Sequence, residues 1–249
     1  MAQFNNAHQS HAHSLQVLNL LKEHDTFMES ISSVADMGAG QGLDALWWAK
    51  ATTRDTPAEA LDLRVFAVDS ADITPDFDVP KNLTFINRNF EKRCVPSQVD
   101  VIWCHNAFQY AINPLDTLRA FNQQMNENGL LYIGMPLLTN HEYGRWQSRG
   151  ENYQLYNHSF LSMVYMLAIN GFDCNDAYFR KAIDDEWLHI AVFKTNKEPM
   201  DPTGVSWYDL AELGLLNPSL VNSLRSHGHI RQQDALFAWL DKALYRIDH

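Results

Sequence analysis

The chain has 249 residues, of which 46% are hydrophobic, 12% aromatic and 20% charged. These values exclude a disordered chain and fit one domain with an elaboration, or one large domain. Its formal net charge of -11, with no run of Lys and Arg longer than two residues, argues against a protein that holds duplex nucleic acid by its phosphates. No stretch approaches 18 consecutive apolar residues, so no membrane-spanning helix is expected.

The first 13 residues are polar and lack the apolar region of a signal peptide. The three cysteines, Cys94, Cys104 and Cys174, are widely spaced and predict neither a zinc site nor a disulfide framework. Free thiols suit a reducing compartment, and we therefore expect a cytoplasmic protein.

The N-terminal region contains His8, His11 and His13, which could bind a metal ion. A flexible polar terminus is the favoured interpretation, and no metal site is predicted. Residues 14–24 then place Leu and Val at helical spacing, with Ser14 as the N-cap. This pattern predicts a short amphipathic helix.

Five apolar runs predict buried strands. They cover residues 34–37, 64–69, 83–86, 99–104 and 130–135. Helical patterns over 43–50 and 114–126 lie between some of them, and the second has Pro114 in its first turn and ends at Asn128-Gly129. Strands that alternate with helices predict a parallel sheet with helices on both faces.

The end of the chain departs from this alternation. A helical pattern over 159–170 precedes two strand-like runs, 172–180 and 187–194, which are separated by a short acidic stretch. That connection is too short for a helical crossover, so the two runs must form an antiparallel hairpin. The predicted fold class is α/β, with a doubly wound, mostly parallel seven-stranded sheet that ends in an antiparallel hairpin.

A C-terminal helical extension is expected beyond the hairpin. Its helical patterns cover 207–213, 218–226 and 231–246. The predicted organisation is a domain over residues 1–198, which includes the N-terminal helix, and an extension over residues 199–249. The extension should pack on the sheet, because its side chains are too apolar to stay in water: Trp207, Leu213, Leu236, Phe237, Trp239 and Leu240.

Residues 36–42, Asp-Met-Gly-Ala-Gly-Gln-Gly, lie between the first predicted strand and the helix that follows. Such glycines let the backbone turn sharply and approach a ligand. The dinucleotide fingerprint would require a further glycine where this chain has Leu43. The spacing D-x-G-x-G-x-G instead resembles that of the class I S-adenosylmethionine (SAM)-dependent methyltransferases. The resemblance covers residues 33–195 and implies SAM as cofactor, contacted by Asp36, Gly38, Ala39, Gly40 and Gly42.

The residues after the second and third strands extend the cofactor prediction. Asp69 closes the second strand, where a carboxylate can accept hydrogen bonds from both ribose hydroxyls, with Ser70 as a neighbouring contact. A solvated strand-end acid is the alternative. The resemblance implies that Asn89 and Phe90, just past the third strand, contact the adenine, and an ordinary turn is the alternative there.

The segment 104–110, Cys-His-Asn-Ala-Phe-Gln-Tyr, follows the fourth strand. The resemblance places Cys104 and His105 beside the methionine moiety and the reactive methyl group. His105 could accept a proton, because its unperturbed pKa lies near neutrality, or could hydrogen-bond the cofactor. Tyr110 is a further catalytic candidate. The N-P-P-[FYW] signature of DNA amino-methylating enzymes is absent.

Residues 137–158 follow the fifth strand at the carboxyl edge of the sheet, where open α/β folds bind ligands. His141 and Tyr143 are catalytic candidates there, and Arg145, Trp146 and Tyr153 are candidate substrate contacts. Of Trp47 and Trp48, at least one is expected in the core. A cation–π contact with the sulfonium is the alternative.

The sequence therefore predicts a methyltransferase that acts on a small-molecule or peptide-like acceptor. Duplex nucleic acid and a membrane are not expected partners. Single-stranded nucleic acid stays an alternative, because aromatic residues of 143–156 could stack on unpaired bases. A catalytically silent SAM-binding module is a second alternative. A nucleotide-dependent oxidoreductase is disfavoured by Leu43 and by the terminal hairpin.

Overall fold

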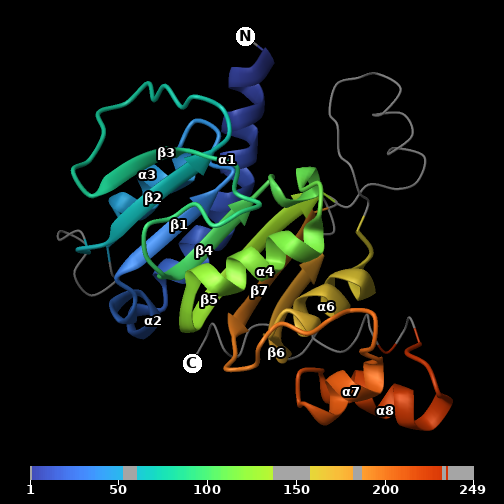
Figure 1. The fold of residues 1–249 in the computed structure, drawn as a ribbon. Coiled ribbons are helices and arrows are strands. Elements are labelled where there is room, and N and C mark those ends of the chain that lie inside the picture. Colours follow the sequence, from blue (N-terminus) through green and yellow to red (C-terminus); the bar gives the residue numbers. More distant parts are fainter. Residues whose placement is uncertain (1, 53–60, 137–157, 182–186, 232–233, 235–249) are drawn as a thin grey trace.

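The computed structural model describes residues 2–52, 61–136, 158–181, 187–231 and 234. Seven strands form one sheet in the order β3-β2-β1-β4-β5-β7-β6 (Figure 1). The strands are β1 (Ser33–Met37), β2 (Arg64–Asp69), β3 (Leu83–Asn87), β4 (Val99–His105), β5 (Met125–Pro136), β6 (Phe172–Lys181) and β7 (Trp187–Lys194). Strands β1 to β5 pair in parallel, whereas β7 is antiparallel to both β5 and β6. The predicted fold class is confirmed.

Helices cover both faces of the sheet. They are α1 (Ala2–Lys22), α2 (Asp25–Ser30), α3 (Leu43–Ala49), the short η1 (Phe108–Tyr110), α4 (Pro114–Gln124), α6 (Phe160–Ile169), α7 (Trp207–Glu212) and α8 (Pro218–His227). Two hydrophobic clusters result, because successive strand residues point to opposite faces. In β1, Val34 packs in the cluster with α1 and α3, and Ala35 packs in the cluster with α4 and α6.

The central strands are nearly continuous in apolar residues because they are covered on both faces. Every residue of β1 is buried, as are all residues of β4 except Asp100. Because β1 and β4 pair in parallel, their last residues, Met37 and His105, lie at the same, carboxyl end of the sheet.

The first helix corrects the prediction for the N-terminus. It begins at Ala2, so the expectation of a flexible polar terminus is wrong. Ser14 is not its N-cap but lies buried in its interior, where the hydroxyl donates to the Asp44 carboxylate at 2.6 Å. The apolar spacing began only at residue 14, because the preceding polar residues carry no hydrophobic pattern that would reveal a helix.

The connection between α4 and β5 also differs from prediction. Helix α4 ends at Gln124, and Asn128-Gly129 lies inside β5, where Asn128 has a φ of 59°. The pairing of β4 with β5 shifts register at this point, from Val99 with Met125 to Val101 with Leu130. The Asn-Gly pair therefore forms an irregularity within a strand rather than the end of a helix.

Part of the C-terminal region contacts the sheet. A residue of β6, Cys174, forms a parallel bridge with Leu216. Cys174 belongs to the hydrophobic cluster on the side of α4 and α6. That cluster also contains Leu210, Leu215, Leu216, Leu220 and Leu224, whereas Leu213 is exposed. Apart from residues 231 and 234, the predicted helix over 231–246 lies outside the described residues. The division at residue 198 stays a prediction.

Two further observations concern the whole described chain. Cys94, Cys104 and Cys174 are all buried free thiols. Among the described residues, no helix combines the length and apolar character needed to cross a membrane.

Candidate functional site

The order of the sheet defines a switch point beside β1. The chain leaves β1 toward β2 and β3 on one side, and later adds β4 and β5 on the other. In open α/β sheets, ligands bind at the carboxyl ends of the strands that flank such a point. A cavity of about 180 Å³ lies there. It is lined by His11, Asp36, Gly38, Ala39, Gly40, Gln41, Leu43, Asp44, His105 and Asn106.

The loop after β1 is shaped by three glycines with positive φ. Gly38, Gly40 and Gly42 have φ values of 77°, 55° and 78°, which side-chain-bearing residues rarely adopt. A Cβ on Gly38 would lie 2.2 Å from the Cβ of Ala107, so this glycine lets two loops meet. A Cβ on Gly40 would meet nothing within 4 Å. Gly40 thus presents bare backbone to open space.

Asp69, at the end of β2, is tied to the glycine loop. Its carboxylate accepts hydrogen bonds from the backbone N–H of Gly40 and of Ala71, both at 2.9 Å. A carboxylate has about four acceptor positions, so two stay available to a ligand. Ser70 is exposed next to it. Asp69 is therefore oriented by backbone N–H groups and can still accept hydrogen bonds from a pair of hydroxyls.

The turn after β3 lies at the same carboxyl end of the sheet as the glycine loop. Asn89 is exposed, and its side-chain oxygen accepts from the backbone N–H of Glu91 at 2.8 Å, which closes a local turn. Phe90 is half-buried against the core, and its ring would lie 3.7 Å from a Cβ on Gly38. Phe90 therefore sits beside the glycine loop.

Two buried aspartates, Asp36 and Asp44, flank the cavity. Burial, together with the charge of Asp44, raises the pKa of Asp36 well above its usual value, and its carboxyl accepts from the Ala45 N–H. Burial also raises the pKa of Asp44, but the hydrogen bond from His11, the charge that His105 carries when protonated, and the bonds from Ser14 and Trp103 outweigh it and lower that pKa. Asp36 therefore holds a proton more strongly than Asp44.

Helix α1 supplies one wall of this site. The Nδ1 of His11 bonds to the Asp44 carboxylate, which also accepts from the Trp103 indole N–H at 2.8 Å. Asp44 had no sequence signal of its own, because an acid in the first turn of a helix is common for reasons of the helix dipole. Among the described residues, no group of three His, Cys, Asp or Glu side chains could hold a metal ion.

A buried polar chain runs from β4 through β5 to β7. The Nδ1 of His105 lies 3.2 Å from the Tyr132 hydroxyl, which in turn lies 2.8 Å from the Nδ1 of His189. Gly134 makes room for the His105 ring, because a Cβ on Gly134 would lie 2.3 Å from the Nδ1 of His105. The His105 ring stacks on Trp187 at 4.7 Å between centroids. Of the three residues in this hydrogen-bonded chain, only His105 was predicted from the sequence.

Several predicted residues that the structure describes are not among those that line this cavity: Gly42, Asp69, Ser70, Asn89, Phe90, Cys104 and Tyr110. The Cys104 thiol is buried in the hydrophobic core, and burial together with the charge of Asp36 raises its pKa. Tyr110 is half-buried in η1, and burial raises its pKa as well. Trp48 is fully buried, as expected for at least one of the two tryptophans. His141 and Tyr143 lie outside the described residues, as do Arg145, Trp146 and Tyr153.

No protein-family model and no curated protein matches this sequence. Many solved structures match, among them three with low sequence identity. A chain described as a methyltransferase, solved in complex with the Haloferax volcanii Trm112 methyltransferase activator, has a TM-score of 0.51 and 16% identity, over 66% of this chain and 83% of that one. A chain from Listeria monocytogenes, described as a SAM-dependent methyltransferase, has a TM-score of 0.50 and 14% identity over 66% and 92%.

The third structure is the Burkholderia thailandensis 1,6-didemethyltoxoflavin-N1-methyltransferase with bound 1,6-didemethyltoxoflavin and S-adenosylhomocysteine. It has a TM-score of 0.50 and 13% identity, over 78% of this chain and 88% of that one. At such identities the likeness establishes a shared fold, and any activity has to be argued from the site itself.

Proposed function

We propose that this chain, which has the Rossmann-like fold of class I SAM-dependent methyltransferases, binds SAM and transfers its methyl group to a small-molecule or peptide-like acceptor. One observation supports this most strongly. The glycine loop and His105 line a single cavity at the switch point of the sheet, with Asp69 bonded to that loop.

The residues present fit the cofactor. Gly40 leaves open space where a side chain would intrude, and Asp69 keeps acceptor positions for a ribose. The adenosine would be held by Asp69, Ser70, Asn89 and Phe90, and the methionine end by Asp36, Gly38, Ala39, Gly40 and Gly42. Cys104 is left out of this proposal because its side chain lies in the core. SAM, when bound, supplies a methyl group activated by a sulfonium.

The protein's main contribution to the reaction is alignment. Holding two reactants in line can contribute roughly 7–11 kcal/mol to lowering a barrier. An oxygen or nitrogen acceptor must also lose a proton, and His105 lines the cavity where that proton would be released. The ionised Asp44 would stabilise the protonated imidazole, since their charges attract.

Tyr132 and His189 would act as positioning residues for His105. Their hydrogen-bonded chain engages the Nδ1 of His105 and fixes the plane of its ring. The stack on Trp187 restricts the same ring from its face. A ring held in this way presents its other nitrogen in a constant direction.

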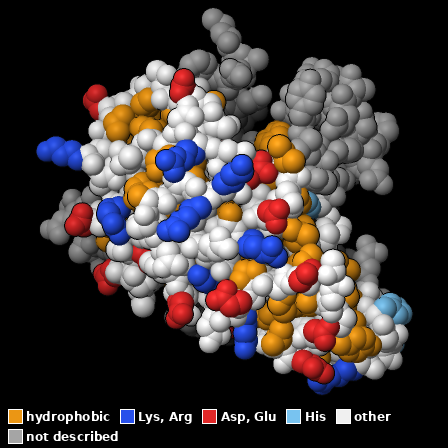
Figure 2. Space-filling model, in the orientation of Figure 1, with side chains coloured by type: hydrophobic (Ala, Val, Ile, Leu, Met, Phe, Trp, Pro, Cys, Tyr) orange, Lys and Arg blue, Asp and Glu red, His pale blue; other side chains and the backbone are white. Residues whose placement is uncertain are grey.

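The acceptor is expected to be compact. The net charge of -11 disfavours a polyanion, and Figure 2 shows acidic side chains beside the basic ones on the face covered by α4. Filter binding at about 50 mM and 200 mM salt would test this, because contacts with phosphates weaken steeply with salt. Tight, salt-sensitive binding of single-stranded RNA or DNA would contradict a compact acceptor.

The direct test of turnover is formation of S-adenosylhomocysteine from SAM in the presence of a metabolite extract. The proposal predicts product that depends on both the protein and the extract. Binding of SAM without any turnover across metabolite and peptide pools would instead identify a silent SAM-binding module.

A further inference from the structure

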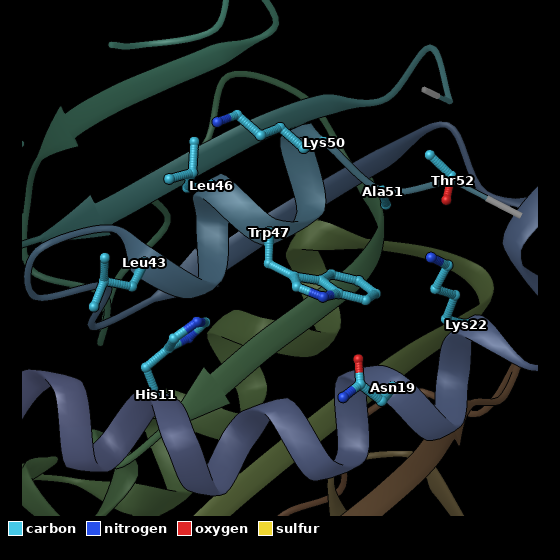
Figure 3. A pocket seen from close by; sticks show the side chains of 9 residues that line it. All are labelled: His11, Asn19, Lys22, Leu43, Leu46, Trp47, Lys50, Ala51 and Thr52. Atoms are coloured by element: carbon cyan, nitrogen blue, oxygen red, sulfur yellow. The ribbon is translucent and has the colours of Figure 1, made fainter. Parts of the chain in front are cut away.

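A second cavity, of about 310 Å³, lies between α1 and α3 (Figure 3). Its lining residues are His11, Asn19, Lys22, Leu43, Leu46, Trp47, Lys50, Ala51 and Thr52. It adjoins the candidate cofactor cavity, because His11 and Leu43 line both. Its volume lies at the lower end of the range for small-molecule sites.

The walls of this cavity divide into an apolar part and a polar part. The half-buried indole of Trp47 lies between the two helices, with Leu43 and Leu46 on the same helix (Figure 3). Near the end of α1, the Lys22 amine and the Thr52 hydroxyl point toward one another (Figure 3). A flat apolar wall thus leads to a cationic end.

The charge of the lining is unusual for this molecule. The described residues around the cavity include two lysines and no carboxylate, although acids outnumber Lys and Arg by 30 to 19 in the chain. An ammonium and a hydroxyl together make a good environment for a carboxylate or phosphate. An indole provides a large, rigid face for a ring.

We infer that the α1–α3 cavity binds a small organic anion with a flat ring, such as an aromatic carboxylate or a ring-bearing phosphate monoester. The ring lies against Trp47, and the anionic group contacts Lys22 and Thr52. This inference does not depend on the proposed function. The shared walls at His11 and Leu43 place this ligand next to the candidate cofactor cavity.

The test uses 2-naphthoate as the probe in a calorimetric titration of the full chain. We expect saturable binding, and much weaker binding of the uncharged 2-naphthamide. Lys22→Gln should weaken 2-naphthoate binding about tenfold, the effect of losing a charge-assisted hydrogen bond. Trp47→Leu should weaken both probes. Lys81→Gln changes an exposed lysine outside the cavity and should leave binding unchanged.

Absence of 2-naphthoate binding would overturn the inference, as would equal affinities for the acid and the amide. Equal affinities in wild type and Lys22→Gln would also overturn it. If circular dichroism shows that Trp47→Leu does not fold, the Lys22→Gln variant and the comparison of 2-naphthoate with 2-naphthamide still test the inference. A titration of the same samples with S-adenosylhomocysteine separates failure of this site from failure of the proposed cofactor site.

Discussion

The two sides of the candidate site are assembled differently. On the side of β1, β2 and β3, the functional groups lie in short segments directly after each strand, and the Gly40 N–H bonds to Asp69 across a gap of 29 residues. On the side of β4, β5 and β7, side chains meet only through strand pairing. His105 and Tyr132 are 27 residues apart, and Tyr132 and His189 are 57 apart.

This difference shows how each side does its work. The first side uses backbone N–H groups and left-handed glycines, which only a particular local sequence allows. The second uses buried polar side chains, whose partners are set by the register of the sheet. The first side suits recognition of a fixed cofactor, and the second suits orientation of one reacting group.

The largest expected effect separates the two sides directly. His105→Gln should lower the rate of S-adenosylhomocysteine formation by about 10²–10⁴-fold, the usual contribution of a general base. The affinity for S-adenosylhomocysteine should change little. His229→Gln, at an exposed histidine, serves as the control. A variant that loses affinity and rate equally would show that His105 binds the cofactor instead of taking a proton.

The next prediction tests the point where the two sides touch. Gly38→Ala should lower the free energy of unfolding by about 3 kcal/mol, because left-handed strain adds to a clash with Ala107. Gly40→Ala suffers only the strain and should cost about 1–2 kcal/mol. Urea unfolding measures both. Equal losses would show that the loops are not packed as described.

We expect the free energy of unfolding to depend on pH through a buried histidine next to the β4, β5 and β7 side of the site. His158 is 8% exposed and packs on Phe108, and burial lowers its pKa from 6.5 to about 4. Below pH 6.5 the His158 side chain takes up a proton in the unfolded chain, whereas in the folded protein it stays neutral until about pH 4. The free energy of unfolding should therefore fall by up to roughly 3 kcal/mol between these pH values.

The measurement compares wild type with His158→Phe, because carboxyl groups also titrate in this range. The variant should lose stability less steeply as the pH falls from 6.5 to 4. Identical pH dependence in the two proteins would show that His158 is not buried in its neutral form.

The smallest effect concerns the hydrogen-bonded chain of His105, Tyr132 and His189. Tyr132→Phe removes the hydroxyl between two imidazoles, and should lower the rate about fivefold, the scale of one hydrogen bond. The pH dependence of the rate should shift as well, since His105 loses a partner. Tyr165→Phe loses a bond to the Val205 carbonyl elsewhere and is the matched control. An unshifted pH profile would limit Tyr132 to a structural role.

The same contrast explains how far the sequence predicted the molecule. Strands 64–69 and 187–194 were predicted with their observed bounds, because parallel or central strands show unbroken apolar runs. The glycine loop and Asp69 were recognised from local spacing. Asp44, Tyr132 and His189 were missed, since nothing near each of them in the sequence indicates a polar partner. The full length of α1 was missed for a related reason, because its first turns carry no apolar pattern.

Binding of the cofactor is the claim on which the proposed function depends, and calorimetric titration of the full chain with S-adenosylhomocysteine and NAD tests it most directly. The glycine loop, with Leu43 in place of the further glycine of the dinucleotide fingerprint, predicts that S-adenosylhomocysteine binds and that NAD does not. Asp69→Ala is expected to weaken S-adenosylhomocysteine binding by about 1.5–3 kcal/mol in a folded protein. Binding of NAD with no binding of S-adenosylhomocysteine, or unaltered affinity in Asp69→Ala, would contradict the assignment.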